Sequence, residues 1–151
     1  MKKFFQTRFI ALCILTCAFL GVVTATATGV DTRSVSGATE IVVDGVTYTL
    51  YSHINYSSNG GVYAGASCSS SKGMPEGYMR VQAVLYDGRG NQVAWSDMVP
   101  KASYNKNANA ITENVTKPGS YYSQAHADIY DPTTGKTRII QGKKTPYFDV
   151  K

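Results

Sequence analysis

The side chains best suited to chemistry in this sequence are a cysteine, a histidine and an aspartate. Cys68, His126 and Asp128 would together supply the nucleophile, base and orienting carboxylate that thiol catalysis requires. His126 and Asp128 are two residues apart in an expected strand, whereas Cys68 shares a strand face with small apolar residues. We therefore expect a buried thiol and surface histidines, and we predict no catalytic residue.

Metal and cofactor patterns are missing from the sequence. His53 and His126 are 73 residues apart, and no HxxxH or CxxC spacing supplies the three or four ligands of a zinc site. Several of the ten acidic residues, such as Asp44, Asp87 and Asp131, belong to expected turns, so no pair is singled out for glycoside hydrolysis. We expect a protein that is not an enzyme and that uses no cofactor and no metal.

Tyrosine is the most distinctive residue type. Eleven tyrosines follow residue 27, against a single phenylalanine, Phe148. Tyrosine gives a large amphipathic contact area at low entropic cost, which suits protein and polysaccharide surfaces alike. The alternative is that the rings pack at sheet edges, with their hydroxyls towards water. Strand alternation places one set opposite the apolar side chains, and we predict a binding face there: Tyr78, Arg80, Tyr86, Tyr122, His126 and Tyr130.

A second candidate site is the polar loop 69–77. Its tip, Met74-Pro75-Glu76, lies between two glycines and is restricted at the proline. Such a loop could present Met74 as an exposed apolar plug, as rigid inhibitor loops do. This gives the alternative function, a secreted antagonist such as a bacteriocin-like toxin or an inhibitor of a hydrolase. The plainer interpretation is an ordinary strand connection.

The net charge argues against a nucleic-acid partner. The formal charge of +5 falls to +2 without residues 1–27, which leaves 12 basic against 10 acidic residues. Binding to phosphates would require a concentrated run of cations. After Gly135, five basic residues accompany Asp149 alone, a pattern typical of an edge strand protected by lysine. It would also suit an anionic cell wall or membrane surface.

The remaining sequence reads as strands separated by turns. Tyr78 to Tyr86 and Tyr121 to Tyr130 alternate cleanly, with Met79, Val81, Ala83 and Leu85 as the buried set of the first. Asp44-Gly45 predicts a type I′ hairpin turn. The strand pattern weakens between residues 100 and 119, where the sequence is compatible with either a short strand or a helical turn. The expected strands are 40–43, 46 onward, 62–68, 78–86, 92–96, 121–130, 136–141 and 147–150.

This spacing predicts an all-β domain of about 7–8 strands, either a single antiparallel β-sandwich or a small barrel. The segment Val81 to Gly90 (VQAVLYDGRG) resembles the strand-and-turn edges of immunoglobulin-like secreted sandwiches. That resemblance implies an immunoglobulin-like architecture and carries no functional residue with it.

The first 27 residues have the pattern of a cleaved export signal. Lys2, Lys3 and Arg8 precede an uncharged apolar run of 15 residues, and Ala25-Thr26-Ala27 suits a signal peptidase. We expect a signal peptide at 1–27, a flexible leader at 28–39 and a sandwich domain at 40–151. The expected product is a secreted, bacterial, extracellular protein without a transmembrane segment, free or associated with the cell wall.

After such cleavage Cys68 is the only cysteine, so the fold cannot depend on internal disulfides. An intermolecular disulfide is the alternative to burial. The expected partner is an extracellular protein or a cell-surface polysaccharide.

Overall fold

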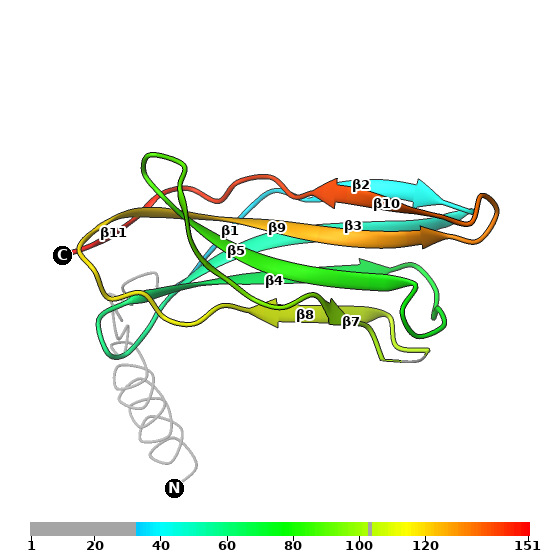
Figure 1. Ribbon diagram of the computed structural model, residues 1–151, viewed down its shortest axis with the longest axis horizontal. Coiled ribbons are helices and arrows are strands. Elements are labelled where there is room, and N and C mark those ends of the chain that lie inside the picture. The colour runs from blue at the N-terminus through cyan, green and yellow to red at the C-terminus, as the bar shows by residue number, and fades with distance from the viewer. Residues whose placement is uncertain (1–32, 103) are drawn as a thin grey trace, which may run out of the picture. The chain divides into compact units, whose positions relative to one another are not determined.

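The computed structural model describes residues 33–102 and 104–151. Within these residues the chain forms two antiparallel sheets packed face to face, with no helix (Figure 1). The predicted β-sandwich is therefore confirmed, and the barrel alternative is excluded. The part of the chain that the structure describes contains no helix long and apolar enough to cross a membrane.

The first sheet has strand order β1-β3-β4-β8, and β2 also pairs with β3. Its central hairpin turns at Asp44 and Gly45, whose φ angles of 48° and 67° fit the predicted type I′ turn. The strands are β1 (Arg33–Val35), β2 (Thr39–Val43), β3 (Val46–Tyr56), β4 (Val62–Ser70) and β8 (Asn107–Ile111).

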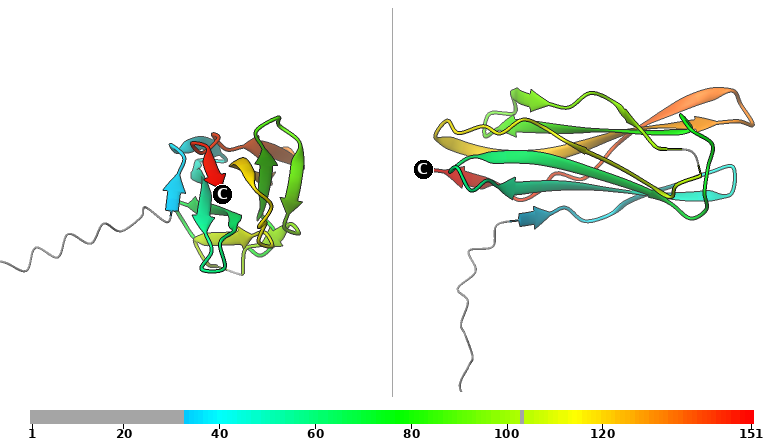
Figure 2. Two further views of the ribbon diagram at one scale, coloured as in Figure 1. Left: turned by 90° about the vertical axis from the view of Figure 1, so that its left-hand side faces the viewer. Right: turned by 90° about the horizontal axis from the view of Figure 1, so that it is seen from below.

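The second sheet has strand order β10-β9-β5-β6, and two short strands pair with its centre. The long strand β9 pairs with β5 over nine consecutive residue pairs, which fixes their register. The two layers are visible from further directions in Figure 2. The strands are β5 (Met79–Asp87), β6 (Gln92–Trp95), β7 (Val99–Pro100), β9 (Gly119–Asp131), β10 (Lys136–Gln141) and β11 (Phe148–Val150).

The core lies between the two sheets and follows the period-two pattern of the sequence. On β5, alternate residues from Met79 to Leu85 are fully buried, as predicted. The same holds on β9 for Ala125, Ala127 and Ile129. These inward side chains are small to medium-sized, so the two sheets pack closely. The residues that alternate with them along each strand lie on the outer face of the sheet.

Ser52 stands at a core position of β3 that an apolar residue would normally occupy. Its hydroxyl accepts a hydrogen bond of 2.9 Å from the backbone N–H of Ala125 on the other sheet. It also donates one of 2.6 Å to the carbonyl of Lys143. These bonds satisfy the buried hydroxyl and tie the sheets together, so β3 continues through the position where the sequence pattern breaks.

One expectation about local structure needs correction. Arg33–Val35, which we expected in a flexible leader, instead pairs with Asn55 to His53 of β3. The backbone N–H of Ser36 then donates to the carbonyl of Ser52. Backbone pairing of this kind needs no apolar pattern, so it could not be predicted from alternation. The predicted signal peptide at 1–27 lies outside the described residues.

Candidate functional site

The candidate site is the outer face of the second sheet, which we call the tyrosine face. Side chains directly opposite each other on paired strands share a face, so the register defines its rows. One row holds Ile139, Asp128 and Arg80. The other rows are Thr137, Tyr130 and Tyr78; Gln141, His126 and Gln82; Gln124, Val84 and Trp95; and Tyr122, Tyr86 and Gln92.

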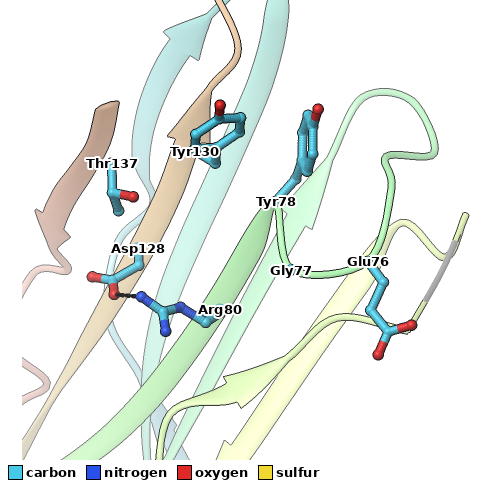
Figure 3. A pocket seen from close by; sticks show the side chains of 7 residues that line it. All are labelled: Glu76, Gly77, Tyr78, Arg80, Asp128, Tyr130 and Thr137. Carbon is cyan, nitrogen blue, oxygen red and sulfur yellow. Dashed lines mark hydrogen bonds and ion pairs between the residues drawn. The ribbon is translucent and has the colours of Figure 1, made fainter. Parts of the chain in front are cut away.

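One end of the tyrosine face is an open hollow of about 510 Å³, which we call the first hollow. The rings of Tyr78 and Tyr130 meet edge to face there, with centroids 4.9 Å apart. Figure 3 shows these rings above the ion pair of Arg80 and Asp128, with Glu76 across from Asp128. The hollow therefore presents aromatic edges, two carboxylates and a guanidinium to one ligand.

The ion pair in the first hollow is half open to solvent. The Nη2 of Arg80 lies 2.7 Å from the Oδ2 of Asp128, and the two side chains are 45% and 13% exposed. A pair this exposed contributes about 0–1 kcal/mol to stability. Its geometry nevertheless holds the guanidinium in place, so the remaining N–H groups are positioned to donate to a ligand.

The other end of the tyrosine face is a cluster of three rings. Tyr86 stacks on Tyr122 with centroids 5.1 Å apart, and Tyr147 meets Tyr122 edge to face at 5.3 Å. The ammonium of Lys144 lies 4.5 Å above the Tyr122 ring. Burial raises the pKa of Tyr86, and Tyr122 raises it further, while Lys144 opposes the shift. Tyr86 therefore remains a neutral hydroxyl at physiological pH.

Polar side chains occupy the middle of the tyrosine face. The amide nitrogens of Gln82 and Gln124 donate to the carbonyls of Ser96 and Gly142, at 2.8 and 2.9 Å. Their carbonyl oxygens accept no hydrogen bond from any described residue and are not buried. Each side-chain amide is thus fixed through its nitrogen, while its carbonyl oxygen can still accept a hydrogen bond. This pre-organises the amide for a hydroxyl or amide donor of a partner.

His126 lies between these amides and differs from a surface histidine. Its Nε2 is buried and has no hydrogen-bond partner among the described residues. Burial lowers the pKa of His126, although nearby Asp128 raises it. The imidazole is therefore neutral at physiological pH, and it adds no charge to the tyrosine face.

The structure brings all six predicted binding residues onto one face. Tyr78, Tyr86 and Tyr130 are partly exposed, and Arg80 is exposed. The expectation that Tyr122 is an exposed contact residue is wrong, because its side chain is only 4% exposed. The neighbouring rings and Lys144 cover it, so Tyr122 supports the face from beneath.

The loop 69–77 does not form the apolar plug on which the alternative function depends. Met74 is 7% exposed and belongs to the hydrophobic core, so the alternative in which it is an exposed tip is wrong. The buried ammonium of Lys101 donates to the carbonyl of Met74 and holds the loop inward. Pro75 and Glu76 are exposed, and Glu76 lines the first hollow.

Some residues of the tyrosine face were missed in the sequence. Trp95, Ile139 and Tyr147 are 59%, 77% and 59% exposed, large values for apolar side chains. Trp95 lies on the short strand β6, Ile139 lies on the edge strand β10, and Tyr147 directly precedes β11, so alternation alone did not assign their side. For Trp95, the predicted hairpin turn at 87–91 could have indicated the side, because it pairs Trp95 with Val84 on the outer face.

The structure separates the residues of the thiol constellation. Cys68 is 1% exposed on the inner face of β4, whereas His126 lies on the outer face of the other sheet. Burial raises the pKa of Cys68 to about 12, so the thiol is protonated and its predicted burial is confirmed. Among residues 33–102 and 104–151, no three His, Cys, Asp or Glu side chains are grouped to hold a metal.

Comparison with protein-family models and with curated proteins found no match to this chain. The described residues form an antiparallel β-sandwich whose second sheet has a tyrosine-rich outer face.

Proposed function

We propose that this chain is a secreted, non-catalytic binding protein that acts at a cell surface and holds its partner on the tyrosine face. The observation that carries the proposal is the arrangement of that face. Partly exposed tyrosines stand at both ends, and between them free amide acceptors are held in place by backbone hydrogen bonds. From Tyr78 to Tyr86 the face extends over about 26 Å, at about 3.3 Å per residue.

A polysaccharide is the partner that this arrangement favours. Aromatic faces and edges contact the apolar C–H surfaces of sugar rings, while fixed acceptors and a guanidinium bind hydroxyl groups. A chain of repeating units would meet rings at each end and polar groups in between. An extracellular protein is the second candidate, favoured by the exposed Trp95 and Ile139, because such side chains are common interface anchors.

Co-sedimentation with a bacterial envelope fraction and with insoluble polysaccharides tests the proposal. We expect the wild-type protein to sediment, and Trp95→Ala to lower the bound fraction at least fivefold. Ile111→Ala is the matched control, because Ile111 is 67% exposed on the other sheet. Equal binding by both variants, or no sedimentation of the wild type, would contradict a partner on the tyrosine face.

Export is a separate part of the proposal and has its own test. The charged start, the apolar run and Ala25-Thr26-Ala27 support cleavage by a signal peptidase. We expect the product recovered from a culture supernatant to begin between Ala25 and Gly29. An intact mass that includes residues 1–24 would contradict it.

A further inference from the structure

A second hollow of about 400 Å³ lies at the end of β5 opposite the first hollow. It is formed where the turn 87–91 meets the segment 117–121. Two cations line it, Arg89 from the turn and Lys117 from the segment. Neither forms an ion pair within the part of the chain that the structure describes, where both ion pairs belong to Arg80 and Arg138.

The one carboxylate of the second hollow is already satisfied. The Oδ1 of Asp87 accepts hydrogen bonds from the backbone N–H groups of Arg89 and Asn91, at 3.0 and 2.8 Å. Its Oδ2 accepts one of 2.9 Å from the side chain of Asn91. Hydrogen bonds from Asn91, and to a smaller extent the nearby charge of Arg89, lower the pKa of Asp87. Asp87 is therefore committed to the turn, and because neither cation is in an ion pair with it, both can bind an external anion.

The backbone that carries the two cations is fixed by hydrogen bonds. The hydroxyl of Tyr121, a ring that is 4% exposed, donates to the carbonyl of Lys117 at 2.7 Å. The turn is closed by two backbone bonds of 2.9 Å between Asp87 and residues Gly90 and Asn91. The second hollow is therefore preformed, which lowers the entropic cost of binding.

The second hollow lies at the end of the tyrosine face, one residue pair beyond Tyr86 and Tyr122, on the core side of the sheet where Asp87 pairs with Tyr121. Asp87 directly follows Tyr86 on β5, and a Cβ placed on Gly90 would lie 3.8 Å from the hydroxyl of Tyr122. Lys144, above the Tyr122 ring, brings a further cation to the same end. The first hollow, by contrast, contains two carboxylates and one guanidinium. The charge along the face is thus polarised, with the positive end at the second hollow.

We propose that the second hollow binds an anionic group of the polymer that lies on the tyrosine face, so that the partner is an acidic polysaccharide. This inference rests on the proposed function and deepens it. The bound group is a carboxylate, sulfate or phosphate, each of which accepts the forked N–H donors of Arg89 and the ammonium of Lys117.

The test measures binding of the purified protein to polygalacturonate and to its fully methyl-esterified form, which has the same backbone without charge. We expect at least fivefold tighter binding to the acidic form at low salt. Arg89→Gln/Lys117→Gln should remove that preference. The control variant Lys72→Gln/Lys136→Gln loses the same amount of charge at exposed positions outside this hollow. It should keep the preference for the acidic polymer. A poly(glycerol phosphate) arm distinguishes phosphate from carboxylate as the source of the anion.

Several results would overturn the inference while leaving the proposed function intact. One is equal binding of the acidic and esterified polymers by the wild type. Another is an Arg89/Lys117 variant that binds like the Lys72/Lys136 variant. Retention on phosphatidylglycerol vesicles that depends on Arg89 and Lys117 would assign the hollow to a membrane instead. If the wild type prefers the acidic polymer and Trp95→Ala loses all polymer binding, both the tyrosine face as binding site and the second hollow as anion site are supported.

Discussion

At the scale of single residues, the tyrosines of one face have different tasks. Tyr122 is 4% exposed beneath its neighbours, whereas Tyr147 is 59% exposed. We expect Tyr122→Ser to lower the free energy of unfolding by about 2–4 kcal/mol, because a buried ring and its stacking contacts are lost. Tyr147→Ser should lower the free energy of unfolding by less than about 1 kcal/mol. Urea denaturation measures both, and equal losses would show that exposure does not separate the two roles.

Asp131 gives the stability a defined dependence on pH. Burial alone would raise its pKa, but hydrogen bonds from Arg138 and from the backbone of Thr133 and Thr134 hold it below 3.8, the ordinary value. A carboxyl with a depressed folded pKa stabilises the fold above its unfolded pKa and loses this effect as the pH falls through the folded pKa.

We therefore expect wild-type stability to exceed that of Asp131→Asn by a constant amount above about pH 5. The difference should shrink as the pH falls below 3.8. Denaturation curves collected between pH 7 and pH 2 measure it. A difference that grows on acidification would contradict the assigned ion pair with Arg138.

Single residues were predictable where they stood in a periodic strand. Cys68 was expected in the core because it alternates with other apolar residues, and its burial is confirmed. Whether Met74 is exposed was not predictable, because a loop has no period that assigns an inward side. Its carbonyl accepts a hydrogen bond from Lys101, which is 27 residues away in the sequence.

At the scale of elements, the pairing of β5 with β9 separates a core face from a binding face. Val81 is fully buried between the sheets, whereas Tyr86 on the same strand faces outward. We expect Val81→Asp to unfold the domain, with a loss of about 4 kcal/mol or more from burying a charge. Tyr86→Ser should leave the circular dichroism spectrum unchanged and weaken binding. If both variants unfold, the tyrosine rings are packing residues.

Lys101 connects two loops at one end of the sandwich. Lys101 is 1% exposed, and its ammonium donates to the carbonyls of Met74 and Ala102. Burial lowers its pKa. We expect Lys101→Met to keep the buried volume but lose these bonds, so that amide hydrogen exchange within residues 71–77 becomes at least tenfold faster. Unchanged exchange in this loop, with faster exchange elsewhere, would contradict the role of Lys101 as its anchor.

Most long elements were predictable, and their pairing was not. Alternation located β5 and β9 within two residues of their observed ends, because a half-buried strand must alternate, and the turn 131–135 located β10. The order of strands depends on long-range contacts that leave no local pattern. For that reason, the neighbours of the predicted binding residues, such as Trp95 and Ile139, became known only from the register.

At the scale of the whole sandwich, the two sheets present different outer surfaces. The outer face of the first sheet carries hydroxyl side chains such as Thr47 and Thr49, together with Tyr51 and His53, whose rings stack with centroids 6.5 Å apart. The second combines rings, fixed amides and two hollows of about 510 and 400 Å³. We therefore expect a partner that needs both aromatic contacts and fixed polar groups to bind the outer face of the second sheet.

Hydroxyl-radical footprinting of the protein with and without the bound envelope fraction tests that claim most directly. Exposed aromatic side chains are oxidised in the free protein, and a partner protects those that it covers. Tyr56 and Tyr104, which are 38% and 78% exposed and lie outside the tyrosine face, serve as internal controls. We predict at least threefold protection confined to Tyr78, Tyr86, Trp95, Tyr130 and Tyr147. Protection of Tyr56 or Tyr104 with no change on the tyrosine face would contradict the account.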